Sequence, residues 1–407
     1  MNFDPITLAI PFYFLLIGLE LLADKIQHQK SYRLHDALTN IGCGASQQIV
    51  GVFLKVISVG IFEVIRYNFA IFDIPVNWLS FIIVFILADF SYYWAHRMSH
   101  EINLFWQAGH VVHHQSEDYN YSVALRQSWF QTFFTSPFYW YIALLGFDTT
   151  QFLLAYGLNT VYQFWIHTEK IGKLGFLEWI MNTPSHHRVH HGRNPEYIDK
   201  NHAGVFIVWD RLFGTFQEEK ERPTYGITTP VKTWNPIWSQ FFGMYQIYQT
   251  TKKMRYFSDK IKVLFKKPGW QPHYLGGSIA APEIDKKTYQ KYDFHASAKI
   301  NYYIFFQYIL TFAGTAYFLF NQQHWQIEYR LLYGFLVAWA VLNTGKLFEQ
   351  NKIWYYVEAF RLIFSFLLVG IGLVYLFGMP TEISVVFSFL TIISIFWWLQ
   401  IKKYIFI

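Results

Sequence analysis

The chain has 407 residues, of which 53% are hydrophobic, 21% aromatic and 15% charged, and its formal net charge is +6. A soluble domain carries about 25% charged residues, so this composition excludes an ordinary soluble protein and is typical of a membrane protein. The single cysteine, Cys43, excludes disulfides within the chain and a thiolate metal cluster. No nucleic-acid partner is expected, because basic loops on the cytoplasmic side of a membrane account for the charge.

Long apolar runs predict about nine transmembrane helices and hence an all-α, polytopic membrane protein. Charge rather than a small-residue cleavage site follows the first run, so we expect this run to be a retained span. Lys55 interrupts the second run, and Pro137 should kink the fourth. The runs lie near Ile6–Leu22, Ser46–Ile65, Trp78–Ala95, Trp129–Leu145, Gln151–Ile166, Asn301–Phe320, Leu331–Leu347, Glu358–Phe377 and Ile383–Leu399.

The distribution of Lys and Arg predicts the orientation of these spans. Residues 25–33, after the first span, are rich in basic side chains, whereas residues 1–5 contain none. The N-terminus should therefore lie outside and the first loop in the cytoplasm. Continuing along the chain places residues 96–129 and 167–300 on the cytoplasmic side.

This topology divides the chain into three parts. Residues 1–95 are expected to form an N-terminal membrane anchor, residues 96–300 a catalytic region that includes a membrane hairpin, and residues 301–407 a C-terminal transmembrane block. The catalytic region should form a helical cap on the cytoplasmic face.

Eight of the 16 histidines fall into three tight groups. Positions i, i+3 and i+4 share one face of a helix, so each group can aim its imidazoles at one point. A lone histidine is usually a hydrogen-bonded polar residue, but burying so many close together without partners would be costly. Neutral imidazole is a common ligand of iron, zinc and copper, so the groups predict metal binding. They are His96 and His100; His110, His113 and His114; and His187, His190 and His191.

Eight imidazoles exceed what one metal ion uses, since zinc sites typically take four ligands. The groups therefore predict a two-metal centre, with no catalytic residue beyond the ligands. Histidine-only sites suit zinc, copper, iron or nickel. Two redox-active irons that share a dioxygen would use this many ligands, so we expect two iron ions and O2.

Asp89 shares a helix face with His96 and His100. An aspartate near the inner end of a span is expensive unless it has a role. We expect its carboxylate to support a ligand imidazole and fix its tautomer. A hydrogen bond to a neighbouring Tyr or Arg is the alternative.

Three further histidines lie near the groups in sequence. His167 follows the predicted membrane hairpin and is a candidate ninth ligand, one helical turn after Gln163. His186 precedes the third group but points about 100° away from His187. We expect His186 and His202 to lie around the ligands rather than among them.

The three groups resemble the HxxxH box and two HxxHH boxes of the sterol desaturase and fatty acid hydroxylase superfamily, whose members are integral-membrane di-iron enzymes. All eight box positions are present. The segment Trp209–Thr215 also resembles the stretch that closes the catalytic domain of that superfamily. The resemblance is strong from Leu87 to Phe216 and weaker outside that range.

More specifically, the chain resembles the branch of the superfamily that cleaves the ether bond of 1-O-alkylglycerols. The segments 96–103, 109–114, 116–120, 124–128, 163–169 and 268–270 carry this likeness. It implies a lipid substrate, dioxygen, tetrahydrobiopterin, hydroxylation of the carbon next to the ether oxygen and release of a fatty aldehyde. It also implies that Glu101 takes part in pterin binding.

Three alternatives and one local question stay open. The same centre would serve a hydroxylase or desaturase of sterols, carotenoids or acyl lipids that uses a separate electron-donor protein. A histidine-rich metal transporter is a non-enzyme alternative, although transporter ligands normally lie near the bilayer midplane. A haem-bearing electron-transfer protein is the third, but paired axial ligands do not call for two HxxHH groups. For Glu101, the alternative to a pterin role is a salt bridge to Arg97.

Overall fold

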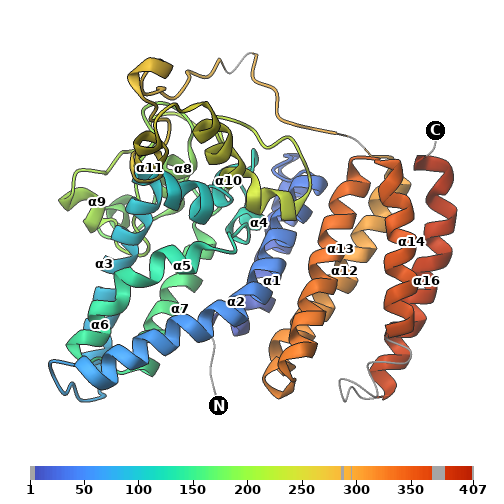
Figure 1. Ribbon diagram of the computed structural model, residues 1–407, viewed down its shortest axis with the longest axis horizontal. Helices are drawn as coiled ribbons and strands as arrows, with labels where there is room; N and C mark the ends of the chain where they lie inside the picture. Colours follow the sequence, from blue (N-terminus) through green and yellow to red (C-terminus); the bar gives the residue numbers. More distant parts are fainter. Residues whose placement is uncertain (1–4, 286–287, 295, 369–380, 406–407) are drawn as a thin grey trace. The chain divides into compact units, whose positions relative to one another are not determined.

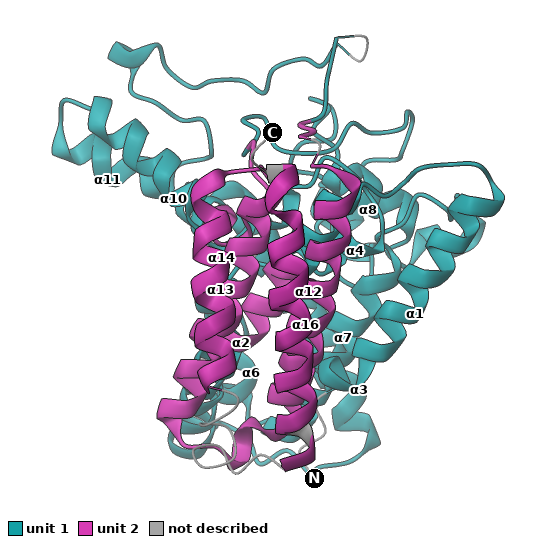
Figure 2. Ribbon diagram, turned by 90° about the vertical axis from the view of Figure 1, so that its right-hand side faces the viewer, with its two compact units in different colours: residues 1–41, 51–231, 240–291 teal, residues 42–50, 232–239, 292–407 magenta. Residues whose placement is uncertain are grey.

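The structure is a computed structural model, and it describes residues 5–285, 288–294, 296–368 and 381–405. Within these ranges the chain is helical, and its only β-type pairing is an isolated antiparallel bridge between Met181 and Phe206. The predicted all-α class is therefore confirmed. The chain divides into two compact units, coloured in Figure 2, made of residues 1–41, 51–231 and 240–291 and of residues 42–50, 232–239 and 292–407.

In the first unit, long apolar helices support the short elements that carry histidines. Helix α3 (Trp78–Glu101) packs against α7 (Thr149–Trp165), and α7 also packs against α1 (Pro5–Ile26). A reciprocal capping box between Asn77 and Ser80 fixes the start of α3, because it satisfies amide groups that the first turn leaves free. The other end of α3 carries the first histidines.

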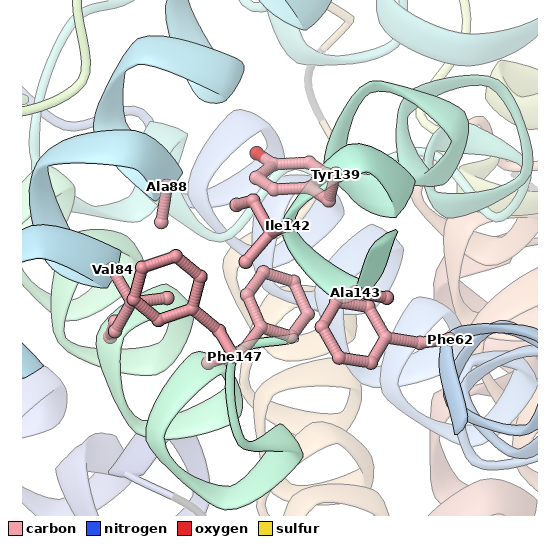
Figure 3. Close-up of a cluster of buried hydrophobic side chains, with 9 residues drawn as sticks. Phe62, Val84, Ala88, Tyr139, Ile142, Ala143 and Phe147 are labelled. Atoms are coloured by element: carbon pink, nitrogen blue, oxygen red, sulfur yellow. The ribbon is translucent and has the colours of Figure 1, made fainter. Parts of the chain in front are cut away.

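A hydrophobic core holds α3 and α7 together, and most of it is labelled in Figure 3. Its rings include Phe62 and Phe152, which stack with centroids 4.5 Å apart. Because lipid tails are as apolar as these side chains, the cluster stabilises the fold through close van der Waals packing rather than through removal of the rings from water. The cluster thereby holds α3 and α7 in a fixed position along each other. Its buried members are Phe62, Val84, Ala88, Tyr139, Ile142, Ala143, Phe147, Phe152 and Ala155.

The remaining elements of this part of the chain are mostly short, and several gather near the C-terminal end of α3 (Figure 1). They are α2 (Leu34–Phe69), η1 (Phe105–His110), η2 (His113–Gln115), α4 (Tyr121–Ala124), α5 (Gln131–Thr135), η3 (Ser136–Tyr139), α6 (Trp140–Leu145), η4 (Gly175–Trp179), α8 (Pro184–His191), α9 (Val208–Leu212), α10 (Pro236–Lys253), α11 (Phe257–Phe265) and η5 (His273–Leu275).

The prediction of one continuous span at Trp129–Leu145 is wrong. The segment forms three short pieces, α5, η3 and α6, each far shorter than the roughly 20 residues that cross a bilayer. Pro137 lies in the middle piece, where its ring and missing N–H prevent a continuous α-helix. At the predicted kink the structure has a 3-10 turn, which divides the segment into short helical pieces.

The second unit is built mainly from four long helices, shown in magenta in Figure 2. Helix α12 (Ala298–Asn321) packs on α13 (Ile327–Phe348) and α16 (Thr381–Ile405), and α14 (Lys352–Leu367) packs on the same two helices. A short 3-10 turn, η6 (Gln322–His324), links α12 toward α13.

A buried ion pair lies inside this bundle. Arg361 donates to both carboxylate oxygens of Glu358, over 2.8 Å and 2.7 Å, and Glu358 is fully buried. Tyr303 and Asn343 also donate to Glu358, and Gln307 accepts from Arg361 over 2.7 Å. The charges are thus paired and hydrogen-bonded, as an apolar environment requires.

Six helices in the described ranges are long and apolar enough to cross a membrane, fewer than the nine predicted. Besides the broken segment, α7 has only 17 residues, and α14 has 16. The predicted span Glu358–Phe377 runs past α14 into residues 369–380, which lie outside the described ranges. The six are Pro5–Ile26, Leu34–Phe69, Trp78–Glu101, Ala298–His324, Ile327–Phe348 and Ser384–Tyr404.

Candidate metal centre

Four local elements present the histidines, and each does so through its own spacing. His96 and His100 are one turn apart at the end of α3, so they share a face. Helix α8 begins at Pro184, whose missing N–H costs nothing in a first turn, and it carries the third group. The second group spans the π-helix η1 and the 3-10 turn η2. These tighter and wider turns place three imidazoles within one short segment.

The structure brings nine histidines together as two sets, and all nine are buried. In each set, one ring nitrogen from every member lies within 4.8 Å of those of the others. His167, which follows α7, belongs to the smaller set, so sequence-distant elements complete it. The five-histidine set is His96, His100, His110, His114 and His190, and the four-histidine set is His113, His167, His187 and His191.

Within each set the Nε2 atoms face one another. In the five-histidine set, the Nε2 of His110 lies 2.9 Å from that of His96 and 3.2 Å from that of His114. In the four-histidine set, the Nε2 of His167 lies 3.2 Å from that of His113 and 3.0 Å from that of His187. A neutral imidazole has one donor and one acceptor nitrogen, so these contacts cannot all be hydrogen bonds.

Backbone carbonyls fix which nitrogen of several rings carries the proton. The Nδ1 of His96 faces the carbonyl oxygen of His202 at 2.8 Å, and the Nδ1 of His190 faces that of Lys200 at 2.9 Å. A carbonyl only accepts, so each Nδ1 must donate. The Nε2 lone pair is then free to face the interior of the set, as a metal ligand requires. The Nδ1 atoms of His113 and His167 are held in the same way, by the carbonyls of Arg126 and Gln163.

Burial keeps these imidazoles neutral. It lowers the pKa of His113 to about 4, and it lowers the pKa of His110 and His190 well below the ordinary histidine value. Neighbouring histidines lower the last two pKa values further, because each added charge would repel the next. Neutral rings with inward lone pairs are ligands rather than bases.

These observations fit two bound metal ions. The Nε2 atoms of His100 and His190 are buried and have no hydrogen-bond partner among the described residues. Leaving several such groups unsatisfied in an apolar interior is costly, whereas a cation at the middle of each set would satisfy them together. Sets of five and four imidazoles suit first-row transition metals.

A polar loop at residues 199–206 positions two of the candidate ligands. Its carbonyls hold His96 and His190, and the loop itself is held by two buried aspartates. Asp210 accepts from the amides of His202 and Ala203, each over 2.8 Å. Asp89 accepts from the amides of Val205 and Phe206 over 2.7 Å and 3.1 Å.

Asp89 therefore affects the histidines indirectly, through the loop at residues 199–206. Its carboxylate also accepts from Asn159 over 2.6 Å and from the indole N–H of Trp209 over 2.8 Å. None of these hydrogen bonds is to an imidazole, so the predicted direct support of a ligand ring is replaced by support of the loop. The carbonyl of His202 is the group that touches His96.

His202 and His186 lie outside the two sets. The ring of His202 is fully buried, 5.1 Å from that of His100 between centroids, and neither of its nitrogens has a hydrogen-bond partner in the described structure. His186 has its Nε2 3.9 Å from Glu178, and burial lowers its pKa to about 4. Its carbonyl accepts from Asn201 over 3.1 Å.

Glu101 forms a salt bridge to Arg97, which is the alternative to a pterin role that the sequence leaves open. Its carboxylate accepts from the Nε of Arg97 over 2.9 Å. Arg97 also donates to Tyr93 over 3.1 Å. The pterin role of Glu101 stays a prediction.

A cavity of about 520 Å³ opens beside the histidines. Members of both sets line it, including His100 and His190 of the larger and His191 of the smaller. Sequence spacing gives no sign of this cavity, nor of the carbonyls that orient the imidazoles, because backbone groups carry no residue signature. The pattern W-D-R does contain Asp210, but only the structure shows what it holds.

The fold and the histidine sets define a helical, histidine-rich membrane protein of the fatty acid hydroxylase type. Residues 81–215 match the family described as fatty acid hydroxylase. This range covers most of α3, helices α5, α6 and α7 and all three histidine groups, and it ends at Thr215. No solved structure matches the chain.

Among curated proteins, the chain is similar to alkylglycerol monooxygenases from three vertebrates. It is 45% identical to that of Homo sapiens over 291 residues, 70% of this chain and 64% of the relative. It is 43% identical to that of Xenopus tropicalis over 274 residues, 66% of this chain and 60% of the relative. With that of Danio rerio it shares 35% identity over 408 residues, 97% of this chain and 89% of the relative.

The chain belongs to the alkylglycerol monooxygenase family, as the nearly full-length match to the Danio rerio protein shows. The matched segment spans somewhat less than two thirds of the Xenopus tropicalis and Homo sapiens relatives. A shorter likeness, 29% identity over 144 residues, relates it to an ornithine lipid hydroxylase of Rhizobium tropici. These relatives favour the monooxygenase hypothesis over the alternatives raised by the sequence.

Proposed function

We propose that the protein is a di-iron monooxygenase that hydroxylates and cleaves glyceryl ethers, using dioxygen and tetrahydrobiopterin. The observation that carries this proposal is the pair of buried histidine sets, with their Nε2 atoms converging. Membership of the alkylglycerol monooxygenase family gives the substrate class. A lipid substrate also agrees with helices apolar enough to span the bilayer.

The proposed reaction balances as a two-electron oxygenation. Dioxygen, two electrons and two protons convert the C–H bond beside the ether oxygen into a C–OH bond, and one water is released. The resulting hemiacetal breaks its bond to the glycerol oxygen, which takes the hydroxyl proton, so fatty aldehyde and glycerol leave. Oxidation of tetrahydropterin to dihydropterin supplies the two electrons and two protons.

Iron bound by the two sets would supply the chemistry that reduces dioxygen and places one oxygen atom on the lipid. The protein's own residues orient the imidazoles that would hold the iron and enclose them in the interior. Carbonyls of the 199–206 loop, Arg126 and Gln163 keep four rings turned inward. Burial of the nine histidines limits the access of water to the centre to the side of the cavity, which limits side reactions.

We further propose the arrangement in the membrane that the positive charges predict. The histidine sets then lie on the cytoplasmic side within a helical cap formed by residues 96–300, between an anchor of residues 1–95 and a transmembrane block of residues 301–407. The described helices support an integral membrane location, since six have the length and composition of spans. A protease-protection assay on tagged loops tests the side.

The function is tested by measuring aldehyde release from a 1-O-alkylglycerol in iron-loaded membranes under oxygen, with and without tetrahydrobiopterin. Pterin-dependent aldehyde is the expected result. Oxygen-dependent product from a sterol or acyl lipid, with a separate electron donor and no aldehyde, would instead move the protein to the alternative hydroxylase or desaturase activity. His190→Ala is the matched inactive control, because it removes a member of the five-histidine set.

A further inference from the structure

The cavity beside the histidines has walls suited to a flat, polar ring. Trp106 lines it, and its ring lies 4.8 Å from that of His100 and 5.2 Å from that of His114 between centroids. A heterocycle stacked on Trp106 would therefore lie next to ligands of the metal centre. The volume of about 520 Å³ falls within the range of small-molecule sites.

Two uncharged or cationic polar groups of this cavity are available to a ligand. The Oδ1 of Asn103 is buried without a hydrogen-bond partner, although its amide nitrogen donates to the carbonyl of Val263 over 3.0 Å. The Nε of Arg193 is likewise buried without a partner in the described structure. Together they offer one acceptor and one donor to the same enclosed space.

Asp199 adds a negative charge. Among the described residues that line the cavity, Asp199 alone carries a carboxylate, and its Oδ1 lies 3.7 Å from the Nδ1 of His100. Its side chain is one third exposed, so it faces the open space rather than the packed interior. Its backbone has φ of 56°, a strained conformation for a residue other than glycine.

We propose that this cavity binds the reduced pterin, and that Asp199 recognises its 2-amino-4-oxopyrimidine edge. That edge presents N–H donors, which suit the carboxylate of Asp199 and the Oδ1 of Asn103, beside a carbonyl oxygen that suits the Nε of Arg193. The inference rests on the proposed function, because it assigns the reductant of that reaction to a place. Glu101, which pairs with Arg97, does not line the cavity.

The test uses the purified, iron-loaded full chain in detergent and 7,8-dihydrobiopterin as the probe, which has the same pyrimidine edge but does not donate electrons to the reaction. Equilibrium dialysis gives its Kd, and iron content is measured on the same samples. The variant is Asp199→Asn, because asparagine tolerates the left-handed backbone and keeps the shape. The control is Glu196→Gln, which makes the same charge change on an exposed side chain three residues before Asp199.

We expect Asp199→Asn to raise the Kd about tenfold or more with iron content unchanged, as for the loss of a charged hydrogen-bond partner. Glu196→Gln should bind as the wild type does. Arg193→Gln, a second variant, should also weaken binding. An unchanged Kd in Asp199→Asn, or a loss of iron that accounts for weaker binding, would overturn the inference.

The two proposals fail in different ways. A wild-type protein that releases aldehyde with tetrahydrobiopterin, while Asp199→Asn keeps its affinity for the probe, leaves the function intact and removes the cavity assignment. A wild-type protein that does not bind 7,8-dihydrobiopterin also removes the assignment. A wild-type protein that binds the probe at Asp199 but releases no aldehyde contradicts the proposed reaction instead.

Discussion

The Nε2 atoms of His113 and His167 lie 3.2 Å apart, although 54 residues separate them in the chain. Each ring donates through its Nδ1 to a backbone carbonyl, of Arg126 and Gln163, so both lone pairs turn toward the same point. This contact joins the second histidine group to the segment that directly follows α7. It makes His167 a full member of the four-histidine set.

Removing His167 should therefore empty one of the two metal positions. We expect His167→Ala to bind about one iron per chain, because three imidazoles remain in its set while the five-histidine set is intact. Iron content of the purified protein checks this. His324→Ala, which changes an exposed histidine, is the control. Two tightly bound irons in His167→Ala would show that His167 is only a neighbour of the centre.

Asp210 should influence metal binding without touching a ligand. It accepts from the amides of His202 and Ala203 and from the hydroxyl of Thr215, the last over 2.7 Å. Asparagine has one oxygen fewer, so a donor of the loop that orients His96 and His190 would lose its partner. We expect Asp210→Asn to lower iron affinity by about 10–100-fold. Competition with a chelator measures it.

The control for that measurement is Asp73→Asn, which changes an exposed aspartate remote from the loop in sequence. Iron affinity equal to wild type in Asp210→Asn would mean that the loop keeps its place without this anchor.

Glu101 tests the role that family resemblance implies. Glu101 does not line the cavity proposed for the pterin, but it directly follows His100, which does, so we expect Glu101→Gln to raise the KM for tetrahydrobiopterin severalfold. Arg97→Gln removes the same salt bridge from the other side, and an ion pair of this exposure contributes about 1 kcal/mol or less. If the two variants change KM equally, or not at all, then Glu101 serves only the salt bridge.

Removing one partner of the ion pair in the second unit should destabilise its bundle. Arg361→Met leaves the carboxylate of Glu358 buried without its cation, so we expect a loss of about 3–5 kcal/mol in the free energy of unfolding. Thermal unfolding of the full chain in detergent measures it. The double variant Glu358→Leu/Arg361→Met should be more stable than Arg361→Met. Equal stabilities would show that the pair is not the cause.

Residue spacing was sufficient to find the eight box histidines, because helical geometry alone turns positions i, i+3 and i+4 to one side. His167 was harder, since one histidine after an apolar run has no spacing partner. Its prediction as a ligand depends on its place directly after the apolar run Gln151–Ile166. The carbonyls of Lys200 and His202 could not be predicted, because any residue offers a carbonyl and only the fold places it.

Asp89 and Pro137 show where local patterns mislead. The helix face that Asp89 shares with His96 suggests a direct contact between them. Instead, the carboxylate accepts from amides of a loop more than 110 residues later in the chain. Hydropathy made residues 129–145 a span, whereas the local geometry at Pro137 breaks the segment into short helices. A distant loop thus determines the contacts of Asp89, whereas the backbone geometry of the proline itself determines the break at Pro137.

The most direct test of the two-metal centre is the iron content of the purified protein, measured together with its Mössbauer spectrum after loading with ⁵⁷Fe. The two histidine sets predict two irons per chain, both in nitrogen-rich surroundings, and loss of one in His167→Ala. A fully active protein with a single iron, or with none, would contradict the account.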